Sequence, residues 1–278
     1  MKSLANEFFV QMAQGTRDHH SEHADQYDLI VNGTKDESDL SQQVSLVQQM
    51  IAARADAIVI APADSKALIP VLRRAVDQGV VVINIDNKLE QEILAAENLA
   101  IPFVGPDNRE GARKVGAHLA QTLAAGDEVA IIGGISTAFN AVQRQLGFED
   151  AMREAGLEVV SVQPGDWEQA KASTVAAALI TEHPGLKAIL CSNDNMALGA
   201  LAALRQAGKL GSIKVVGFDN ISAVHEPIRS GAMLATADQY GHLLAVYGVE
   251  SALQILNEGS SPEDRNTPVD LITAANLD

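Results

Sequence analysis

Four apolar runs of this chain end in an acid-amide pair, a combination of side chains that suits a ligand made of hydroxyl groups. The runs read "VINIDN", "FVGPDN", "LCSNDN" and "VVGFDN", and the pairs are Asp86-Asn87, Asp107-Asn108, Asp194-Asn195 and Asp219-Asn220. A carboxylate accepts hydrogen bonds from hydroxyls, and an amide both donates and accepts them. Helix capping is the alternative explanation, and it would account for about half of the pairs.

Aromatic side chains make up only 4% of the chain, so their positions are informative. Phe8 and Phe9 stand at the start of the first predicted helix, and Trp167 follows the turn "QPGD" at the start of another. Flat apolar rings suit the C–H faces of a sugar. Core packing is the alternative for the two phenylalanines, whereas the polar loop around Trp167 argues against it there.

The elements that must position these residues follow from periodicity. Short β-branched runs alternate with helix-like segments, which predicts parallel sheets covered by helices on both faces. The predicted strands are 27–33, 57–62, 80–86, 128–134, 157–163, 186–192 and 213–219, and the predicted helices are 10–17, 39–53, 66–77, 140–155, 168–182 and 196–206. These units are too many for one sheet, so we expect two doubly wound α/β domains, with 101–108 as a passage between them. Ligands bind at the carboxyl ends of such strands, where the acid-amide pairs lie.

Composition excludes several classes of partner. The net charge of −16 disfavours nucleic acids and anionic membrane surfaces. No run of eighteen apolar residues is present, so no membrane span is predicted. Cys191 is the single cysteine, which excludes an intrachain disulfide and a cysteine-based zinc site. Composition leaves the compartment open.

One pair of residues has the spacing of a metal site. His19 and His23 in "DHHSEH" lie one helical turn apart. No third ligand is evident, so a solvated helix end is the preferred interpretation. We predict no metal, no cofactor and no catalytic residue.

Taken together, these residues resemble a known family. The segments "NEFFVQMAQG", "DAIVIAPADSKALIPVLRRAVDQGVVVINID", "RQLGFEDAM", "NDNMALGALAAL", "VVGFDN" and "LATADQ" make the chain similar, over essentially its whole length, to the ribose-type periplasmic sugar-binding proteins of ABC transporters. The resemblance implies the type I periplasmic-binding-protein fold, two doubly wound lobes that close on one monosaccharide. It places hinge crossings near Pro106-Asp107, Ala237-Asp238 and Val269-Asp270. The implied lobes are 1–106 with 239–268, and 107–238 with 269–278.

The resemblance also implies which residues bind the sugar. Carried over by position, they are Asn6, Phe8, Phe9 and Asp86 in the first lobe, Arg144, Trp167, Asn193 and Asp219 in the second, and Gln239 at the hinge. Asp194 is then expected to cap the following helix. Many relatives have Asp-Arg where this chain has Asp86-Asn87, and a small hydroxyl residue where it has Lys2. Lys2 and Asn87 therefore join the predicted ligand residues. Lys2 would supply, from another wall of the pocket, the positive donor that the arginine supplies in those relatives.

The function that the resemblance implies is sugar import. We expect a monomeric, periplasmic solute-binding protein that delivers one monosaccharide to a membrane permease of an ABC transporter and contacts no nucleic acid. A pentose such as ribose or arabinose is the first expectation, and a hexose or polyol is the alternative.

Two other functions share parts of the pattern. One is the sensor core of a lac-repressor-type regulator, although no residues precede Met1 to form its DNA-binding domain. The other is a glycoside-processing enzyme using Asp86 and Asp219, although nothing in the sequence marks either carboxyl as raised in pKa.

The start of the chain raises one structural question. In the resembled fold, a buried central strand precedes "LANEFF", and this chain has only Met1, Lys2 and Ser3 there. We therefore expect the first strand of the first lobe to be missing, with a gap or a closed-up sheet between 27–33 and 57–62. An upstream segment carrying this strand and a secretion signal would explain the difference.

Overall fold

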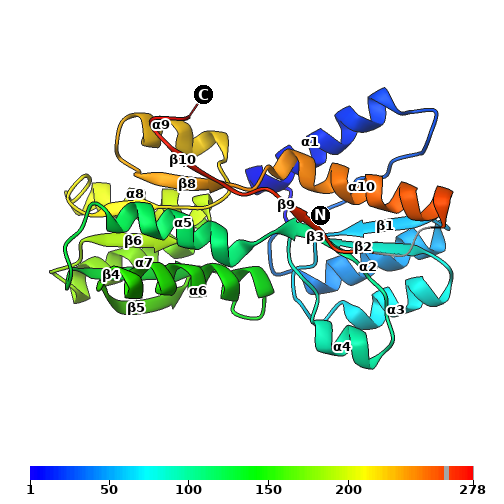
Figure 1. Ribbon diagram of the computed structural model, residues 1–278, viewed down its shortest axis with the longest axis horizontal. Coiled ribbons are helices and arrows are strands. Elements are labelled where there is room, and N and C mark those ends of the chain that lie inside the picture. The colour runs from blue at the N-terminus through cyan, green and yellow to red at the C-terminus, as the bar shows by residue number, and fades with distance from the viewer. Residues whose placement is uncertain (260–262, 278) are drawn as a thin grey trace. The chain divides into compact units, whose positions relative to one another are not determined.

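The protein consists of two compact units. The structure, a computed structural model, describes residues 1–259 and 263–277. Unit 1 comprises Met1–Pro106 and Tyr240–Thr267, and unit 2 comprises Asp107–Gln239 and Pro268–Asp278 (Figure 1). The boundaries differ from the predicted ones at two residues: Gln239 and Pro268 belong to unit 2. Gln239 does so because it follows a strand of that unit and binds Asp219. The predicted end of the second lobe, residue 278, lies outside the described residues.

Unit 1 is built on a parallel sheet with the strand order β1-β2-β3-β9. Its strands are β1 (Ala57–Ile60), β2 (Val81–Ile85), β3 (Phe103–Pro106) and β9 (Arg265–Thr267). The inner strands β2 and β3 are almost wholly buried, as expected for strands covered on both faces. The passage predicted at 101–108 is thus a strand of this sheet that ends where the chain enters unit 2.

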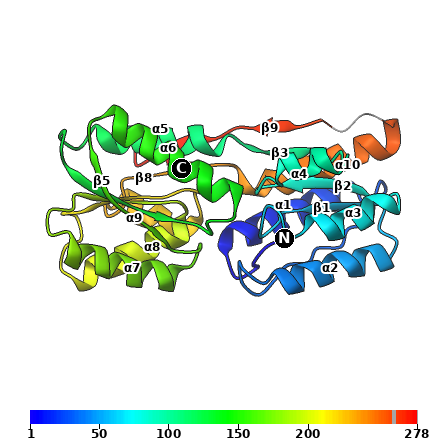
Figure 2. The ribbon, with the colours of Figure 1, turned by 90° about the horizontal axis from the view of Figure 1, so that it is seen from below.

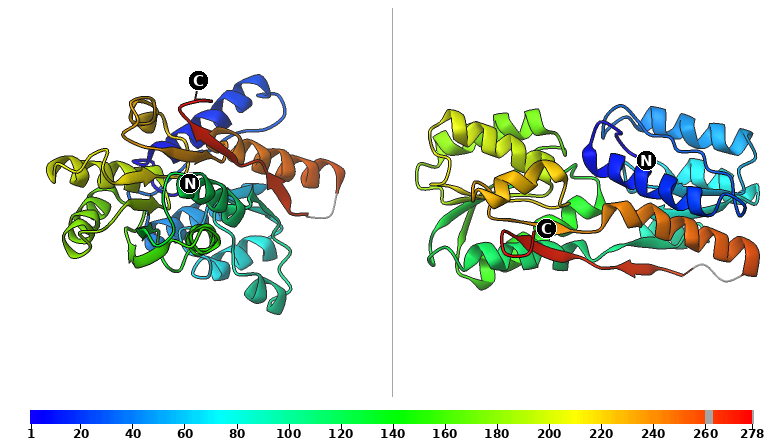
Figure 3. Two further views of the ribbon diagram at one scale, coloured as in Figure 1. Left: turned by 60° about the vertical axis from the view of Figure 1, so that its left-hand side comes forward. Right: turned by 90° about the horizontal axis from the view of Figure 1, so that it is seen from above.

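Helices cover both faces of this sheet. In Figure 1, α1 (Glu7–Glu22) and α10 (Gly241–Glu258) lie on one face, and α2 (Leu40–Ala52) and α3 (Ile69–Asp77) lie on the other. The short helix α4 (Gln91–Ala96) follows β2. Helices α1 and α10 run side by side (Figure 3), and a Cβ on Gly15 would lie 2.0 Å from the backbone oxygen of His242. Only glycine permits this close crossing.

The strand predicted at 27–33 is wrong. These residues form no strand, none of them is buried, and Ile30 is 61% exposed. A strand needs a neighbouring ladder, and the end of this segment bonds instead to the first residues of the chain. Thr34 forms an isolated parallel bridge with Ser3, and its N–H donates to the Lys2 carbonyl at 3.2 Å. Among the described strands β1 pairs with β2 alone, so this side of the sheet is an open edge rather than a closed-up sheet.

Unit 2 is built on a larger sheet with the order β10-β8-β7-β6-β4-β5. Its strands are β4 (Glu128–Gly133), β5 (Glu158–Pro164), β6 (Ala188–Cys191), β7 (Lys214–Val216), β8 (Ala235–Asp238) and β10 (Asp270–Thr273). All neighbours are parallel except β10, which runs antiparallel to β8 at the edge. The expectation of purely parallel sheets is therefore wrong at this one strand.

The helices of unit 2 form two pairs, one on each face of the sheet (Figure 2). One pair is α5 (Asn108–Ala120) with α6 (Phe139–Glu154), and the other is α7 (Gln169–Glu182) with α8 (Asp194–Gln206). A Cβ on Gly147 would lie 2.1 Å from the Arg109 backbone oxygen, so α5 and α6 also cross closely. Two short helices, η1 (Ser222–Val224) and α9 (His225–Arg229), follow β7. Apart from 27–33, the predicted strands and helices are all present.

No described helix is both long enough and apolar enough to cross a bilayer. The apolar segments lie instead in the cores of the two units. In unit 2 the core joins α5 and α6 to the sheet through Phe148, Ile131, Leu190 and Phe218.

We expect the single thiol to be inert in the folded protein. Cys191 is buried at the end of β6, and its burial, with a smaller contribution from the Asp194 charge, raises the pKa of the thiol far above its usual range. Because the thiolate is the reactive form, a fluorescent maleimide should label the native protein negligibly and the denatured protein fully. Stoichiometric labelling of the native protein within minutes would contradict this.

Candidate functional site

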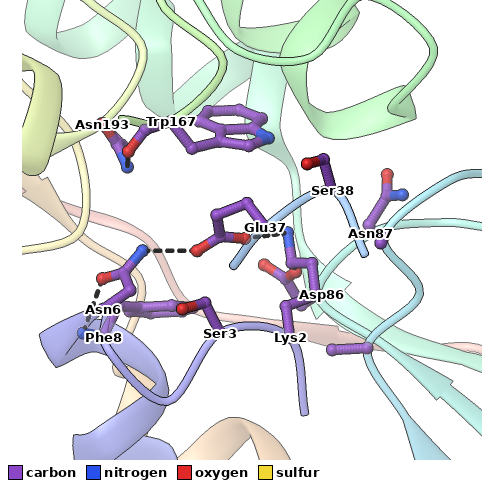
Figure 4. Close-up of polar contacts among 12 residues, drawn as sticks. Lys2, Ser3, Asn6, Phe8, Glu37, Ser38, Asp86, Asn87, Trp167 and Asn193 are labelled. Carbon is purple, nitrogen blue, oxygen red and sulfur yellow. Dashed lines mark hydrogen bonds and ion pairs between the residues drawn. The ribbon is translucent and has the colours of Figure 1, made fainter. Parts of the chain in front are cut away.

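Unit 1 places Asn6 at the entrance of its first helix. The Asn6 side chain is the N-cap of α1: its Oδ1 accepts the N–H of Phe8 at 3.0 Å. Its Nδ2 donates to Oε1 of Glu37 at 2.8 Å (Figure 4). Capping fixes where α1 begins, and therefore where the two following aromatic residues lie.

Phe8 and Phe9 are both buried in unit 1. Their rings meet edge to face, with centroids 5.1 Å apart. The Phe8 ring lies against the start of α10, where a Cβ on Gly241 would come within 2.5 Å of it. The Nζ of Lys2 lies 5.0 Å from the centre of the Phe9 ring. Both rings are thus part of the packing that surrounds a buried charge.

That charge belongs to a cluster of one ammonium and two carboxylates. Lys2 Nζ lies 3.0 Å from Oδ2 of Asp86 and 3.8 Å from Oε2 of Glu37, and all three side chains are at most 4% exposed (Figure 4). Buried ion pairs seldom stabilise a fold more than apolar residues of similar volume would. Stability of unit 1 therefore does not by itself account for this buried cluster of charged side chains.

Sequence reasoning missed Glu37. It lies in "KDESD", an acidic stretch that looks like a solvated turn. It is 31 residues from its partner Asn6, so only the tertiary structure brings the two together. No local signal distinguishes it from its exposed neighbour Asp36.

The backbone that carries Asp86 is strained and braced. Asp86 has a φ of +62°, in the left-handed region that non-glycine residues rarely adopt. The buried Asn84 side chain spans the turn: its Oδ1 accepts the N–H of Leu89 at 2.8 Å, and its Nδ2 donates to the Asn87 carbonyl at 2.8 Å. Asn87 donates from its own Nδ2 to the Pro62 carbonyl at 3.0 Å. Asn84 was not among the predicted site residues.

Unit 2 places Arg144 at the centre of a second buried polar cluster. Its Nε donates to Oδ1 of Asn108 at 2.8 Å. Its Nη1 donates to the Ser192 carbonyl at 2.9 Å and lies 3.3 Å from Oδ1 of Asp219. The guanidinium lies 3.8 Å from the centre of the Phe218 ring. The cation is therefore fixed by hydrogen bonds in its plane and by an aromatic ring.

Trp167 lies beside this cluster and is buried, although its loop is polar. The guanidinium carbon of Arg144 lies 5.6 Å from its ring centre. A Cβ on Gly134 would come within 2.1 Å of the ring, so the indole packs on the backbone after β4. Trp167 has a φ of +70°, so it is, after Asp86, a second predicted ligand residue with a strained backbone.

The helix cap after β6 differs from the expected one. Asn193, not Asp194, is the N-cap of α8: its Oδ1 accepts the N–H of Met196 at 2.9 Å. The expectation that Asp194 caps the helix is wrong, because Asp194 is the first residue inside α8 and its carboxylate bonds elsewhere. Asn193 Nδ2 also donates to the Trp167 carbonyl at 3.4 Å (Figure 4).

Asp219 and Gln239 complete the cluster of unit 2. Gln239 Nε2 donates to Oδ1 of Asp219 at 2.7 Å, and Asp219 has a φ of +123°. Within the described residues, the buried Oε1 of Gln239 and the buried Oγ of Ser192 have no hydrogen-bond partner. Buried polar atoms are normally paired, so these two are available to a bound ligand.

Capping explains only part of the acid-amide pattern. Asp107 caps α5 through the N–H of Glu110, as the alternative interpretation requires. Asp86 and Asp219 cap no helix and instead face Lys2 and Arg144. They follow β2 and β7, and hydroxyl binding stays a prediction at these two aspartates.

The histidines of α1 bond within their own neighbourhood. The rings of His19 and His23 stack at 4.2 Å, His19 Nδ1 lies 2.8 Å from the Tyr27 hydroxyl, and His23 Nδ1 donates to the His19 carbonyl at 2.8 Å. Across 1–259 and 263–277, no three His, Cys, Asp or Glu residues are grouped so as to hold a metal ion.

Comparison with known proteins identifies the class. Residues 1–260 match the family described as periplasmic binding protein domain. This match covers most of the chain, so the protein belongs to the periplasmic binding protein family.

Individual proteins of this family are similar to the chain in sequence and in structure. A protein from Pseudomonas aeruginosa named D-ribose/D-allose-binding protein is 53% identical over 279 aligned residues, covering 99% of this chain and 87% of the relative. An ABC transporter solute-binding protein from Burkholderia multivorans has a crystal structure with 54% identity and a TM-score of 0.96, covering 98% of this chain and 97% of that one. A periplasmic solute-binding protein from Actinobacillus succinogenes, solved with bound D-allose, has 32% identity and a TM-score of 0.93, covering 99% and 96%.

These findings bear directly on the sequence analysis. The similarity to ribose-type periplasmic sugar-binding proteins and the type I fold are confirmed. The relatives are named for binding and not for catalysis, which confirms the prediction that the protein is not an enzyme.

Removing the cation of the unit 1 cluster should be costly. We expect Lys2→Met to lower the free energy of unfolding by about 3 to 5 kcal/mol, because it removes the Lys2 cation from between two buried carboxylates. The matched control is Lys88→Met, which breaks a more exposed pair with Asp264 and should cost about 1 kcal/mol or less. Urea unfolding followed by circular dichroism measures both. Equal losses in the two variants would contradict the assignment of a buried charge cluster.

Proposed function

We propose that this protein is the extracytoplasmic solute-binding component of an ABC importer and that it binds one monosaccharide of the D-ribose configuration. The observation that carries the proposal is the Arg144–Asp219–Gln239 network. It presents a charged donor from α6, a charged acceptor after β7 and a partnerless amide oxygen after the neighbouring strand β8. Hydroxyl groups of a sugar satisfy all three.

We propose a role for each predicted ligand residue. The charged groups bind hydroxyls, the amides orient them, and the rings pack on C–H faces. In unit 1 these residues are Lys2, Asn6, Phe8, Phe9, Asp86 and Asn87, and in unit 2 they are Arg144, Trp167, Asn193, Asp219 and Gln239. That the two sets bind the same sugar rests on the family to which the chain belongs.

The choice of sugar rests on the names of the relatives and on stereochemistry. The Pseudomonas relative is named for D-ribose and D-allose. These two sugars have the same configuration at C2, C3 and C4, and allose adds only a hydroxymethyl group to the pyranose ring. A site that binds the three shared hydroxyls through charged hydrogen bonds accepts both D-ribose and D-allose. D-arabinose, the pentose inverted at C2, directs one hydroxyl away from its partner.

The proposed partner is the membrane permease of the importer, with the protein acting as a monomer outside the cytoplasm. A sugar-sensing core of a lac-repressor-type regulator is the second candidate for this fold.

Binding should distinguish the three pentose and hexose candidates. At a hundredfold excess over its dissociation constant, a true ligand adds about 2.7 kcal/mol to folding stability and should raise the melting temperature by about 5 °C or more. We expect this shift, and a saturable change in Trp167 emission, with D-ribose and D-allose. D-arabinose should give at least tenfold weaker binding. Preference for D-arabinose would contradict the proposed configuration.

Each buried charge should be needed for affinity. We expect Arg144→Ala and Asp86→Ala to weaken D-ribose binding by about 2 to 4 kcal/mol, because a buried hydrogen-bonded charge loses its partner. Arg109→Ala is the matched control, since Arg109 pairs with Asp150 on the surface of unit 2. Isothermal titration calorimetry measures all three. Parental affinity in Arg144→Ala would remove that residue from the site.

A further inference from the structure

The segment that carries Asp219 is an unusual piece of backbone. Asp219 and Asn220 follow β7 with φ values of +123° and +55°. Two successive non-glycine residues in this region are strained and persist only where surrounding structure holds them. The position of the Asp219 carboxylate against Arg144 and Gln239 therefore depends on whatever holds this turn.

Asp194 bonds to the turn at both of its ends. Its N–H donates to the Phe218 carbonyl at 2.8 Å, on the side before Asp219. Its Oδ2 accepts the N–H of Ile221 at 3.1 Å, on the side after Asn220. The same residue thus bonds to the chain on either side of the strained pair.

The second carboxylate oxygen is used through Thr236. Asp194 Oδ1 accepts the Thr236 hydroxyl at 2.7 Å, and the Thr236 Oγ1 accepts the N–H of Asn220 at 3.4 Å. Asp194 and Thr236 are both fully buried. The hydroxyl acts as donor to Asp194 and as acceptor from the turn, so the direction of each hydrogen bond is consistent.

The neighbouring chain leaves room for this carboxylate. A Cβ on Gly217 would lie 2.2 Å from Oδ1 of Asp194. Any larger residue at position 217 would displace the carboxylate that braces the turn. The sequence "VVGFDN" therefore contains both Asp219 and Gly217, the glycine that leaves space for the Asp194 carboxylate.

We infer that Asp194 is a positioning residue for ligand binding: its carboxylate holds the Asp219-Asn220 turn in its strained conformation and thereby fixes the Asp219 carboxylate beside Arg144 and Gln239. This inference rests on the proposed function in one respect, that Asp219 binds the sugar. Asp194 is fully buried and both of its oxygens accept from protein donors, so the role that we infer for it is indirect.

An ionised Asp194 carboxylate does not stabilise the folded state. Burial, with a further contribution from the Asp219 charge, raises the pKa of the Asp194 carboxyl well above its usual range. A carboxyl whose pKa is higher in the folded state than in the unfolded state favours folding at low pH and opposes it once ionised. Replacement by the isosteric amide therefore removes an electrostatic penalty on folding while it disturbs the geometry of the turn.

The test compares Asp194→Asn, Thr236→Val, Asp219→Asn and the double variant Asp194→Asn/Asp219→Asn by calorimetric titration with D-ribose. We expect Asp194→Asn to weaken binding about tenfold or more in a protein that still folds, and Thr236→Val to weaken it in the same direction. The double variant should bind no more weakly than Asp219→Asn alone, because Asp194 acts through Asp219. Additive losses, or parental affinity in Asp194→Asn, would overturn the inference.

Hydrogen exchange of the sugar-free protein tests the role of Asp194 independently of the proposed function. Hydrogen exchange of the Ile221 and Asn220 amides should accelerate in Asp194→Asn and remain unchanged in Asp150→Asn, a carboxylate of the same unit that binds Arg109 and Arg153. Unchanged exchange at Ile221 in Asp194→Asn overturns the positioning role whatever the ligand is. If the parent protein binds neither D-ribose nor D-allose while the exchange accelerates as expected, the proposed ligand is wrong and the brace stands.

Discussion

The buried Arg144 guanidinium is the group around which unit 2 organises its polar residues. It is held by Asn108 at the start of α5 and by the Ser192 carbonyl after β6, and it faces Asp219 after β7. In a low-dielectric setting, the attraction between this fixed cation and its carboxylate partner is stronger than it would be in water. The strand order of unit 2 puts β6 and β7 side by side, which lets one side chain reach both. Remove the cation, and Asp219 is left as an uncompensated buried charge.

Unit 1 also contains a buried cation that faces an aspartate, formed by different residues. Lys2 supplies the cation and Asp86 the carboxylate, while Glu37 adds a second acidic group that binds the cap of α1. In both units the aspartate has a positive φ and follows a parallel strand. In both, a fully buried polar side chain braces the turn, Asn84 in unit 1 and Asp194 in unit 2. Strained backbone at both of these aspartates is in keeping with the tendency of such strain to occur at binding sites.

In the function that we propose, these clusters serve recognition rather than stability. Buried ion pairs are worth little to a fold compared with apolar packing, whereas preorganised charged donors and acceptors bind hydroxyl groups without rearrangement on binding. The partnerless Gln239 oxygen fits this account, since its hydrogen bond is left for a ligand to make. The cores of the two units, built from alternating apolar strands and amphipathic helices, supply the stability on which the clusters depend.

The sequence by itself determined the alternation of strands and helices, the family, and the positions of Asp86, Asp219 and the aromatic residues, because these depend on local periodicity and on motifs at strand ends. The tertiary structure decided what depends on distant partners. It showed that residues 27–33 form no strand, because nothing buries Ile30, and that β10 pairs antiparallel with β8. It brought Glu37 to Asn6 and turned Asp194 from an expected cap into the brace of Asp219. A side chain near a helix start has several possible partners, and only the packed fold selects one.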